Sequence, residues 1–204
     1  VETTSNVSRR VRAALNDRSS EWVLVGGPPC QAYSLAGRSR MRTTRPDFES
    51  DERHFLYREY LQIVARHRPA IFVMENVRGI LSSTHGGTAI FDRITRDLRR
   101  PAVALGLDEN RGLQYRLYGL APNARGEYVD GGDPEKHFLL KAEQHGVPQA
   151  RHRVIIVGVR SDLDGAPDPL EATTSQVSVN DVIGDLPALR SRLSRGRDSW
   201  DSWK

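Results

Sequence analysis

Apolar and polar residues follow one another along this chain in two rhythms, one typical of helices and one typical of short buried strands. In the first rhythm apolar residues recur three and four positions apart, and in the second a short run is apolar throughout. The first rhythm predicts helices over residues 6–17, 54–66, 87–100 and 178–189. The second predicts strands over residues 22–25, 70–74, 114–118, 137–142 and 154–159. Because helices separate the strands, the pattern predicts an α/β domain with a largely parallel sheet.

The segments between these elements differ in composition. Residues 36–53 contain five arginines and almost no apolar side chain, so they are expected to form a polar loop. Residues 101–135 are rich in glycine and irregular in pattern, as expected of an insertion. The chain turns polar and rich in proline soon after Arg160. These changes predict one main body over residues 1–165 and a separate polar segment over residues 166–204.

The balance of charges favours an anionic partner. The chain has 30 lysines and arginines against 26 acidic residues, a net charge of +4. All of the basic residues except Lys136, Lys141 and Lys204 are arginine, whose rigid fork of donors matches phosphate oxygens and base edges. The composition is therefore compatible with nucleic-acid binding, although a general compositional bias toward arginine would produce the same excess.

Nothing in the sequence indicates a membrane or a metal site. The longest apolar runs, residues 70–74 and 154–159, are far shorter than a membrane-spanning helix requires. The single cysteine, Cys30, excludes an internal disulfide and any zinc site with two thiolates, and no two histidines lie four residues apart. We therefore expect no membrane contact, no metal and a cytoplasmic location.

Reactive side chains are expected at one edge of the sheet, because ligands of parallel α/β sheets lie beyond the carboxyl ends of the strands. Cys30 follows the strand at 22–25, and Glu75 directly follows the strand at 70–74, where desolvation would suit it to general-acid chemistry. If the strand at 154–159 forms a hairpin with the preceding one, Arg151 and Arg153 reach the same edge. A nearby guanidinium would favour the thiolate form of the cysteine.

Each of these residues also has a simpler explanation. Cys30 is equally compatible with a small buried hydrophobic residue, and Glu75 with a paired surface acid. A cysteine hydrolase is the least favoured enzyme class, because no histidine is placed by the sequence to act as a base for Cys30.

Three short motifs resemble those of a known family. The sequences GPPCQ at residues 27–31, ENV at 75–77 and QARHR at 149–153 resemble the PCQ, ENV and QxRxR signatures of cytosine-5 DNA methyltransferases, in the same order. The resemblance extends from about Glu21 to Leu189. It implies a partial Rossmann-like methyltransferase sheet, mostly parallel with one antiparallel hairpin strand, in which residues 1–165 form the central part of the catalytic domain.

The resemblance implies roles for the candidate residues. Carbon 5 of cytosine is a poor nucleophile, so in this family a cysteine thiolate, here Cys30, first adds to carbon 6. Glu75 is then expected to protonate ring nitrogen 3, while Arg151 and Arg153 hold the cytosine after it has flipped out of the duplex. Asn76 is expected to brace the segment that contains the cysteine through backbone hydrogen bonds.

Further residues match positions around the cofactor and the DNA. Gln31 is expected to support the nucleophile, and Pro29 and Leu56 to touch S-adenosylmethionine. Residues 36–53 match the catalytic loop, which is expected to bind double-stranded DNA through basic side chains. Those candidates are Arg38, Arg40 and Arg42.

The sequence also departs from the family pattern. No glycine-rich loop precedes Cys30, and residues 166–204 lead toward a target-recognition domain that does not follow, so we expect a fragment that lacks the main S-adenosylmethionine segment and is inactive alone. The expected activity of the complete enzyme is methylation of DNA cytosine, as in restriction–modification systems. Two alternatives remain open, an inactive nucleic-acid-binding fragment and a tRNA cytosine-5 methyltransferase.

Overall fold

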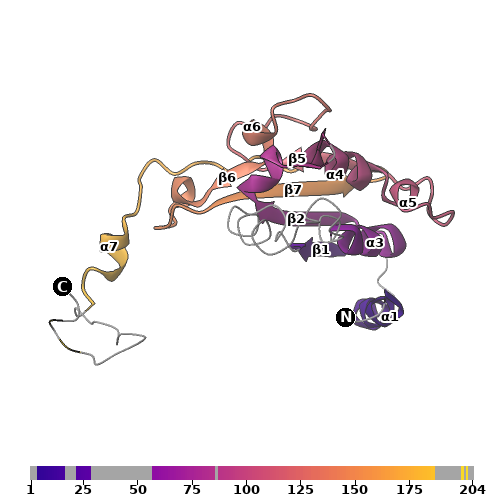
Figure 1. Ribbon diagram of the computed structural model, residues 1–204, viewed down its shortest axis with the longest axis horizontal. Helices are drawn as coiled ribbons and strands as arrows, with labels where there is room; N and C mark the ends of the chain where they lie inside the picture. Colours follow the sequence, from indigo (N-terminus) through magenta and orange to yellow (C-terminus); the bar gives the residue numbers. More distant parts are fainter. Residues whose placement is uncertain are drawn as a thin grey trace.

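The computed structural model describes residues 4–16, 22–28, 57–85, 87–186, 199 and 201. A five-stranded sheet runs through the middle of the described part (Figure 1). Four strands lie side by side in the order β1 (Val23–Gly26), β2 (Ile71–Val77), β7 (His152–Arg160) and β5 (Tyr115–Gly119). The short strand β6 (Leu139–Lys141) pairs with the first residues of β7. All five predicted strands are therefore present.

The strand directions agree with the predicted fold class. β1 and β2 pair in parallel, whereas β2, β5 and β6 each pair with β7 in the antiparallel sense. Four strands consequently point one way and β7 alone points the other way. The hairpin between β6 and β7 that the sequence predicts is confirmed. The carboxyl ends of β1, β2 and β6 meet the start of β7 at one edge of the sheet.

The helices differ from their predicted bounds mainly at the ends. Four were predicted near their observed positions, and several short elements were not predicted. The predicted ones are α1 (Thr4–Leu15), α4 (Ile90–Arg99) and α7 (Val179–Ile183), and α3 (Tyr57–His67) is described from Tyr57 onward. The additional ones are α5 (Pro101–Ala104), α6 (Pro134–Phe138), the 3-10 helices at Arg78–Ser82 and Ala142–His145, and the strands β3 (Thr84–His85) and β4 (Thr88–Ala89).

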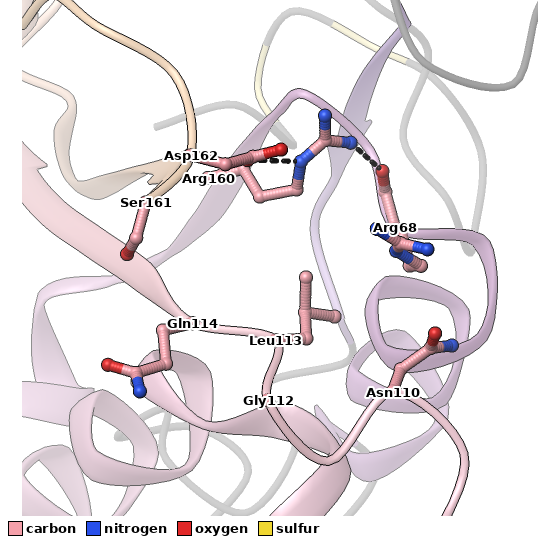
Figure 2. Close-up of a pocket in the computed structure, with 8 residues that line it drawn as sticks. All are labelled: Arg68, Asn110, Gly112, Leu113, Gln114, Arg160, Ser161 and Asp162. Atoms are coloured by element: carbon pink, nitrogen blue, oxygen red, sulfur yellow. Dashed lines mark hydrogen bonds and ion pairs between the residues drawn. The ribbon is translucent and has the colours of Figure 1, made fainter.

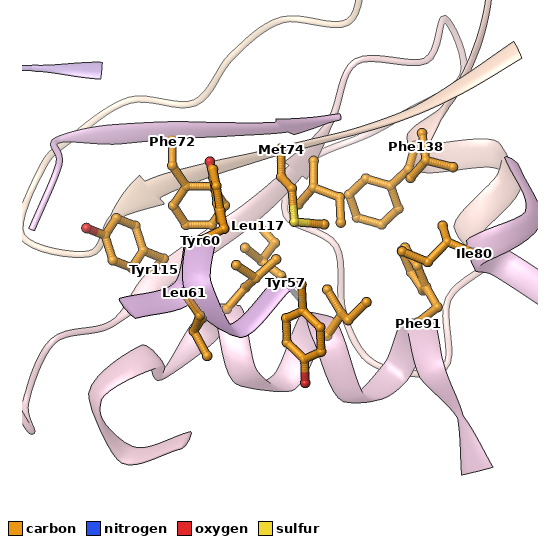
Figure 3. Close-up of a cluster of buried hydrophobic side chains, with 14 of the residues drawn as sticks. Tyr57, Tyr60, Leu61, Phe72, Met74, Ile80, Phe91, Tyr115, Leu117 and Phe138 are labelled. Carbon is orange, nitrogen blue, oxygen red and sulfur yellow. The ribbon is translucent and has the colours of Figure 1, made fainter. Parts of the chain in front are cut away.

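The main core lies between one face of the sheet and helices α3 and α4 (Figure 3). Phe72 and Met74 of β2 project into it, because alternate residues of a strand share one face. Gly158 of β7 lies under the Phe72 ring, and a β-carbon there would stand only 2.1 Å from a ring atom. Side chains from every layer complete the cluster. They include Tyr57, Leu61, Val64, Ile80, Phe91, Ile94, Leu98, Leu117, Phe138 and Ile156.

The second face of the sheet is covered more thinly by the described residues. Tyr118, Val157 and Val159 form a small buried cluster there, packed by Leu120 and Leu163. On the outer strand β1, the side chains of Val23 and Val25 are 53% and 72% exposed. None of the described helices is long and apolar enough to span a membrane.

Two observed elements change the local expectations. β2 runs to Val77, so Glu75 lies within the strand and does not follow it. The segment predicted as a strand from His137 begins as helix α6, which Asp133 caps by accepting hydrogen bonds from two backbone N–H groups. Residues 101–135 supply β5 to the sheet, and their description as an insertion stays a prediction.

The contact between α1 and α3 should respond to pH. Ser8 Oγ and His67 Nε2 lie 2.9 Å apart, and burial, with Arg12 and Arg66 nearby, lowers the pKa of His67 below its usual value. A histidine with a lowered folded pKa contributes stability above its unfolded pKa, about 6.5, and loses it as the pH falls. We expect α1 to loosen from α3 as the pH falls from about 7 to about 5.

Trp22 provides the measurement for this prediction. Its Nε1 donates a hydrogen bond to the His67 carbonyl oxygen over 3.3 Å, so its fluorescence reports on this contact. With Trp200 and Trp203 replaced by phenylalanine, the emission of Trp22 should shift with pH, and His67→Gln should remove the shift. A titration that is unchanged by His67→Gln would contradict the prediction.

Candidate active site

The candidate residues gather where β1 and β2 end and β7 begins. Gly27 and Pro28 follow β1 directly, and Glu75 and Asn76 are the two residues before the last residue of β2. Arg153 is the second residue of β7 and lies opposite Val77 in the register. The predicted convergence at this edge of the sheet is therefore observed for the described members of the set.

Glu75 and Arg153 form the centre of this group. Glu75 lies opposite Ile155, two residues from Arg153, so both side chains emerge on the same face as diagonal neighbours. Arg153 Nε stands 2.7 Å from Glu75 Oε1. The side chain of Glu75 is 41% exposed and that of Arg153 25% exposed. Glu75 is therefore half-buried, with one side open to solvent and a guanidinium beside it, and its expected role as a general acid stays a prediction.

Arg153 retains a donor that its neighbours do not use. Its Nη1 donates to the His152 carbonyl oxygen over 2.7 Å. Although Nε is close to Glu75, its N–H is not directed at the carboxylate, and Nε is buried without an acceptor among the described residues. A buried donor without an acceptor is costly, and the charge of Glu75, 2.7 Å away, offsets part of this cost.

Glycine at position 27 lets the end of β1 lie against Glu75. A β-carbon at Gly27 would stand 2.9 Å from Glu75 Oε2, closer than carbon and oxygen approach without displacement. Glu75 is thus enclosed by Gly27 on one side and Arg153 on the other. Gly27 lies three residues before Cys30 in the sequence, which ties the carboxylate to the segment with the candidate nucleophile.

Asn76 joins the two parallel strands from the core side. The residue is only 2% exposed, and its Nδ2 donates to the Pro28 carbonyl oxygen over 3.3 Å. Its Oδ1 accepts a hydrogen bond from the Val77 N–H over 2.9 Å. Asn76 therefore holds the backbone two residues before Cys30, the kind of contact that the sequence analysis expected of it.

Arg151 is not brought into the same group. It lies just before β7, its side chain is exposed, and its carbonyl oxygen accepts a hydrogen bond from the Ala142 N–H over 3.0 Å. Among the described residues, no hydrogen bond or ion pair joins its side chain to Glu75 or Arg153. Only Arg153 is paired with Glu75, and the expected convergence of Arg151 on this edge stays a prediction.

Comparison with known proteins shows the family of the chain. The model of the C-5 cytosine-specific DNA methylase family matches residues 14–100 and 135–201, which is well over half of the chain. The chain belongs to this family. The matched segments include the end of β1, Glu75 and Asn76 of β2 and the start of β7, whereas residues 101–134, which contain β5, lie outside the match.

Curated relatives of the methylase family agree with this assignment. The chain is 32% identical over 174 residues to the type II methyltransferase M.Bpa9945I of Bacillus paralicheniformis, covering 83% of the chain and 33% of the relative. It is 29% identical to M.MthTI of Methanothermobacter thermautotrophicus, covering 92% of the chain and 48% of the relative. The chain therefore spans between a third and a half of the length of these relatives.

A solved structure supports the fold. A prophage-encoded DNA modification methyltransferase of E. coli superposes on 94% of this chain and 42% of its own, with a TM-score of 0.53 and 21% sequence identity. At this identity the likeness concerns the fold. It supports the partial methyltransferase sheet that the motifs imply.

Several candidates lie outside the described residues. They include the nucleophile candidate Cys30 and its neighbour Gln31, the cofactor candidates Pro29 and Leu56, and the catalytic loop at 36–53 with Arg38, Arg40 and Arg42. Their roles stay predictions. The described residues contain no group of three or more histidine, cysteine or acidic side chains that could hold a metal ion.

The sequence analysis missed a pair beside this edge. His152 Nε2 and Glu143 Oε1 lie 2.7 Å apart, joining the loop after β6 to the start of β7. Hydrogen bonds from its own backbone N–H and from His152 lower the pKa of Glu143. The sequence did contain a signal for this pair. Side chains alternate along a strand, so His152 points to the side opposite Arg153 and can pair with a residue there.

Replacing Asn76 by alanine should test whether the backbone contact matters for more than stability. The Pro28 carbonyl and the Val77 N–H lose a buried partner, so we expect the free energy of unfolding to fall by about 1–3 kcal/mol. Denaturant unfolding measures this loss. In the complete protein we also expect slower covalent capture of cytosine, because the segment before Cys30 is no longer held.

Ser83→Ala is a matched control for this prediction. Ser83 is 5% exposed and donates one hydrogen bond to the Gly79 carbonyl over 2.6 Å, and it makes no hydrogen bond to the candidate residues. It should reduce stability and leave capture unchanged. Equal losses of capture in both variants would assign Asn76 a purely structural role.

Proposed function

We propose that the protein containing this chain transfers a methyl group from S-adenosylmethionine to carbon 5 of cytosine in double-stranded DNA. The observation that supports this most is the grouping of Glu75 and Arg153 with Gly27, the residue directly before the Pro-Pro-Cys sequence. The chain also belongs to the C-5 cytosine-specific DNA methylase family. The curated relatives are type II methyltransferases, which favours modification within a restriction–modification system. Such an enzyme would work in the cytoplasm, where its DNA substrate lies.

The chemistry uses the residues at this edge in sequence. The Cys30 thiolate adds to carbon 6 of a flipped cytosine and forms a sulfur–carbon bond, while ring nitrogen 3 receives a proton from Glu75. Carbon 5 then becomes nucleophilic and takes the methyl group that S-adenosylmethionine supplies. The proton at carbon 5 is then lost to a base, ring nitrogen 3 returns its proton to Glu75, and the sulfur–carbon bond breaks. These changes release the Cys30 thiolate and restore the aromatic ring.

Arg153 orients both the carboxyl group and the base in this proposal. Its Nε lies 2.7 Å from Glu75 Oε1 and fixes the carboxyl group toward Gly27. The Arg153 side chain is 25% exposed, so the outer end of its guanidinium is proposed to reach a carbonyl oxygen of the flipped base. Arg151, which is exposed, is proposed to contact the surroundings of the base.

The remaining proposed contacts involve residues outside the described part. Gln31 would support the nucleophile, and Pro29 and Leu56 would touch S-adenosylmethionine. The arginines of the catalytic loop would neutralise DNA phosphates, a contribution that salt weakens. These are Arg38, Arg40 and Arg42.

The test is covalent capture by the complete protein. The complete protein is incubated with S-adenosylmethionine and DNA that carries 5-fluorocytosine. Fluorine at carbon 5 cannot be lost as a proton would be, so the thiolate is not released and the enzyme should remain attached to the DNA after denaturation. Capture of tRNA and not DNA would favour the tRNA methyltransferase, and capture of neither would favour an inactive nucleic-acid-binding protein. Either result would overturn the proposed function.

A further inference from the structure

A polar pocket lies at the edge of the sheet opposite the candidate active site (Figure 2). It has a volume of about 300 Å³, at the small end of the range for small-molecule sites. It lies where α3 ends, β5 begins and β7 ends. Arg153 and Arg160 stand at the two ends of β7, about 23 Å apart at the usual rise of a strand. The lining residues are Arg68, Asn110, Gly112, Leu113, Gln114, Arg160, Ser161 and Asp162.

The floor of this pocket is prearranged. Leu113 is 8% exposed and lies in the middle of the group in Figure 2. The side chain of Arg160 is 10% exposed, donates from Nε to Asp162 Oδ1 over 2.6 Å and from Nη1 to the Arg68 carbonyl oxygen over 2.8 Å. Asp162 neutralises one guanidinium, and Arg68 leaves the pocket with a net positive charge.

Three polar side chains at the rim are unpaired within the described part of the chain. The Arg68 guanidinium, the Gln114 amide and the Ser161 hydroxyl make no hydrogen bond or ion pair with another described residue, and all three residues are exposed. These side chains can therefore bind a ligand without breaking a hydrogen bond or ion pair inside the protein. Asp162, whose side chain is 59% exposed, adds an acceptor.

Backbone strain also gathers at this pocket. Only Asn16, Arg68 and Asn110 among the described non-glycine residues have a positive φ, and two of these three line the pocket. Arg68 follows the last residue of α3, with φ +48° and its N–H bonded to the Val64 carbonyl oxygen. Glycine is the residue favoured in this left-handed position at a helix end. An arginine there is unfavourable for the backbone, as is common for residues kept at binding sites.

We propose that this pocket binds a small phosphorylated sugar, either free or as part of a nucleotide. The Arg68 guanidinium is suited to bind the phosphate, since its fork of N–H groups matches two phosphate oxygens. The Asp162 carboxylate and the Gln114 amide accept hydrogen bonds from sugar hydroxyls, and the Ser161 hydroxyl adds a donor. Leu113 provides an apolar surface for the carbon skeleton.

The experiment is isothermal titration of the complete protein with ribose 5-phosphate, inorganic phosphate and ribose. We expect saturable binding of ribose 5-phosphate at one site per chain, weaker binding of phosphate and none of ribose. An arm with adenosine monophosphate separates the sources: tighter binding than ribose 5-phosphate indicates a nucleotide, and equal binding indicates a free sugar phosphate. Absence of saturable binding of either phosphorylated sugar would overturn the proposal.

The variant Arg68→Gly separates a loss of ligand binding from a loss of folding. Glycine relieves the positive φ, so the variant should melt at or above the temperature of the wild type, yet it should bind ribose 5-phosphate about tenfold more weakly or worse. Arg111→Ala is the matched control, because Arg111 is an exposed arginine beside the pocket that does not line it and should bind normally. Undiminished binding by Arg68→Gly would overturn the proposal.

Discussion

Replacing Cys30 by serine in the complete protein is expected to abolish covalent capture of DNA that carries 5-fluorocytosine. The serine side chain has nearly the same shape as that of cysteine. Its hydroxyl is not ionised near neutral pH and is a much weaker nucleophile than a thiolate, so the bond to carbon 6 does not form. Cys30 is the expected nucleophile because the segment just before it is held at the candidate site. Asn76 binds the Pro28 carbonyl, and Gly27 lies against Glu75. Denaturing electrophoresis of the protein–DNA mixture measures the loss.

DNA binding should survive this substitution. Phosphate contacts dominate the affinity for DNA, and Cys30→Ser removes no charge of a basic side chain. A gel-shift titration should therefore give a dissociation constant close to that of the wild type. An adduct that persists in Cys30→Ser would place the nucleophile elsewhere, and joint loss of adduct and DNA binding would point to a structural role.

The fold was largely predictable because its strands differ strongly from their surroundings. The runs at 70–74 and 154–159 are apolar on both sides, as expected of the two central strands β2 and β7. The end of β2 was missed, because Glu75 and Asn76 are polar residues inside a strand. Each has a local reason to be there, since Glu75 faces Arg153 and Asn76 hydrogen-bonds to Pro28.

The candidate site was predictable only in part. Sequence order and strand direction brought Glu75 and Arg153 to one edge, but they did not reveal that Arg151 lies before the strand with an exposed side chain. The Glu143–His152 contact spans a hairpin, and such pairs depend on register that spacing alone does not give. The pocket around Arg68 was missed because its residues come from three distant segments.

Replacing Glu75 by glutamine should slow methyl transfer about 100- to 10,000-fold, the range for loss of a positioned general acid. Glutamine keeps the size that fits against Gly27 and Arg153, so the site should remain folded. Its amide, however, has no carboxyl proton to give to ring nitrogen 3. Single-turnover methyl transfer, started from a preformed complex of the protein with DNA, measures the chemical step apart from binding.

A matched pair elsewhere separates the loss of a carboxyl group in the site from the loss of any exposed ion pair. Glu135 Oε1 lies 3.0 Å from Arg78 Nη2, and its side chain is 49% exposed, close to the 41% of Glu75. Exposed pairs contribute only about 0–1 kcal/mol, so Glu135→Gln should leave both stability and methyl transfer nearly unchanged. Glu75→Gln should match it in stability and DNA affinity and differ in rate alone. Equal rates in the two variants would show that Glu75 is a paired surface acid with no part in proton transfer.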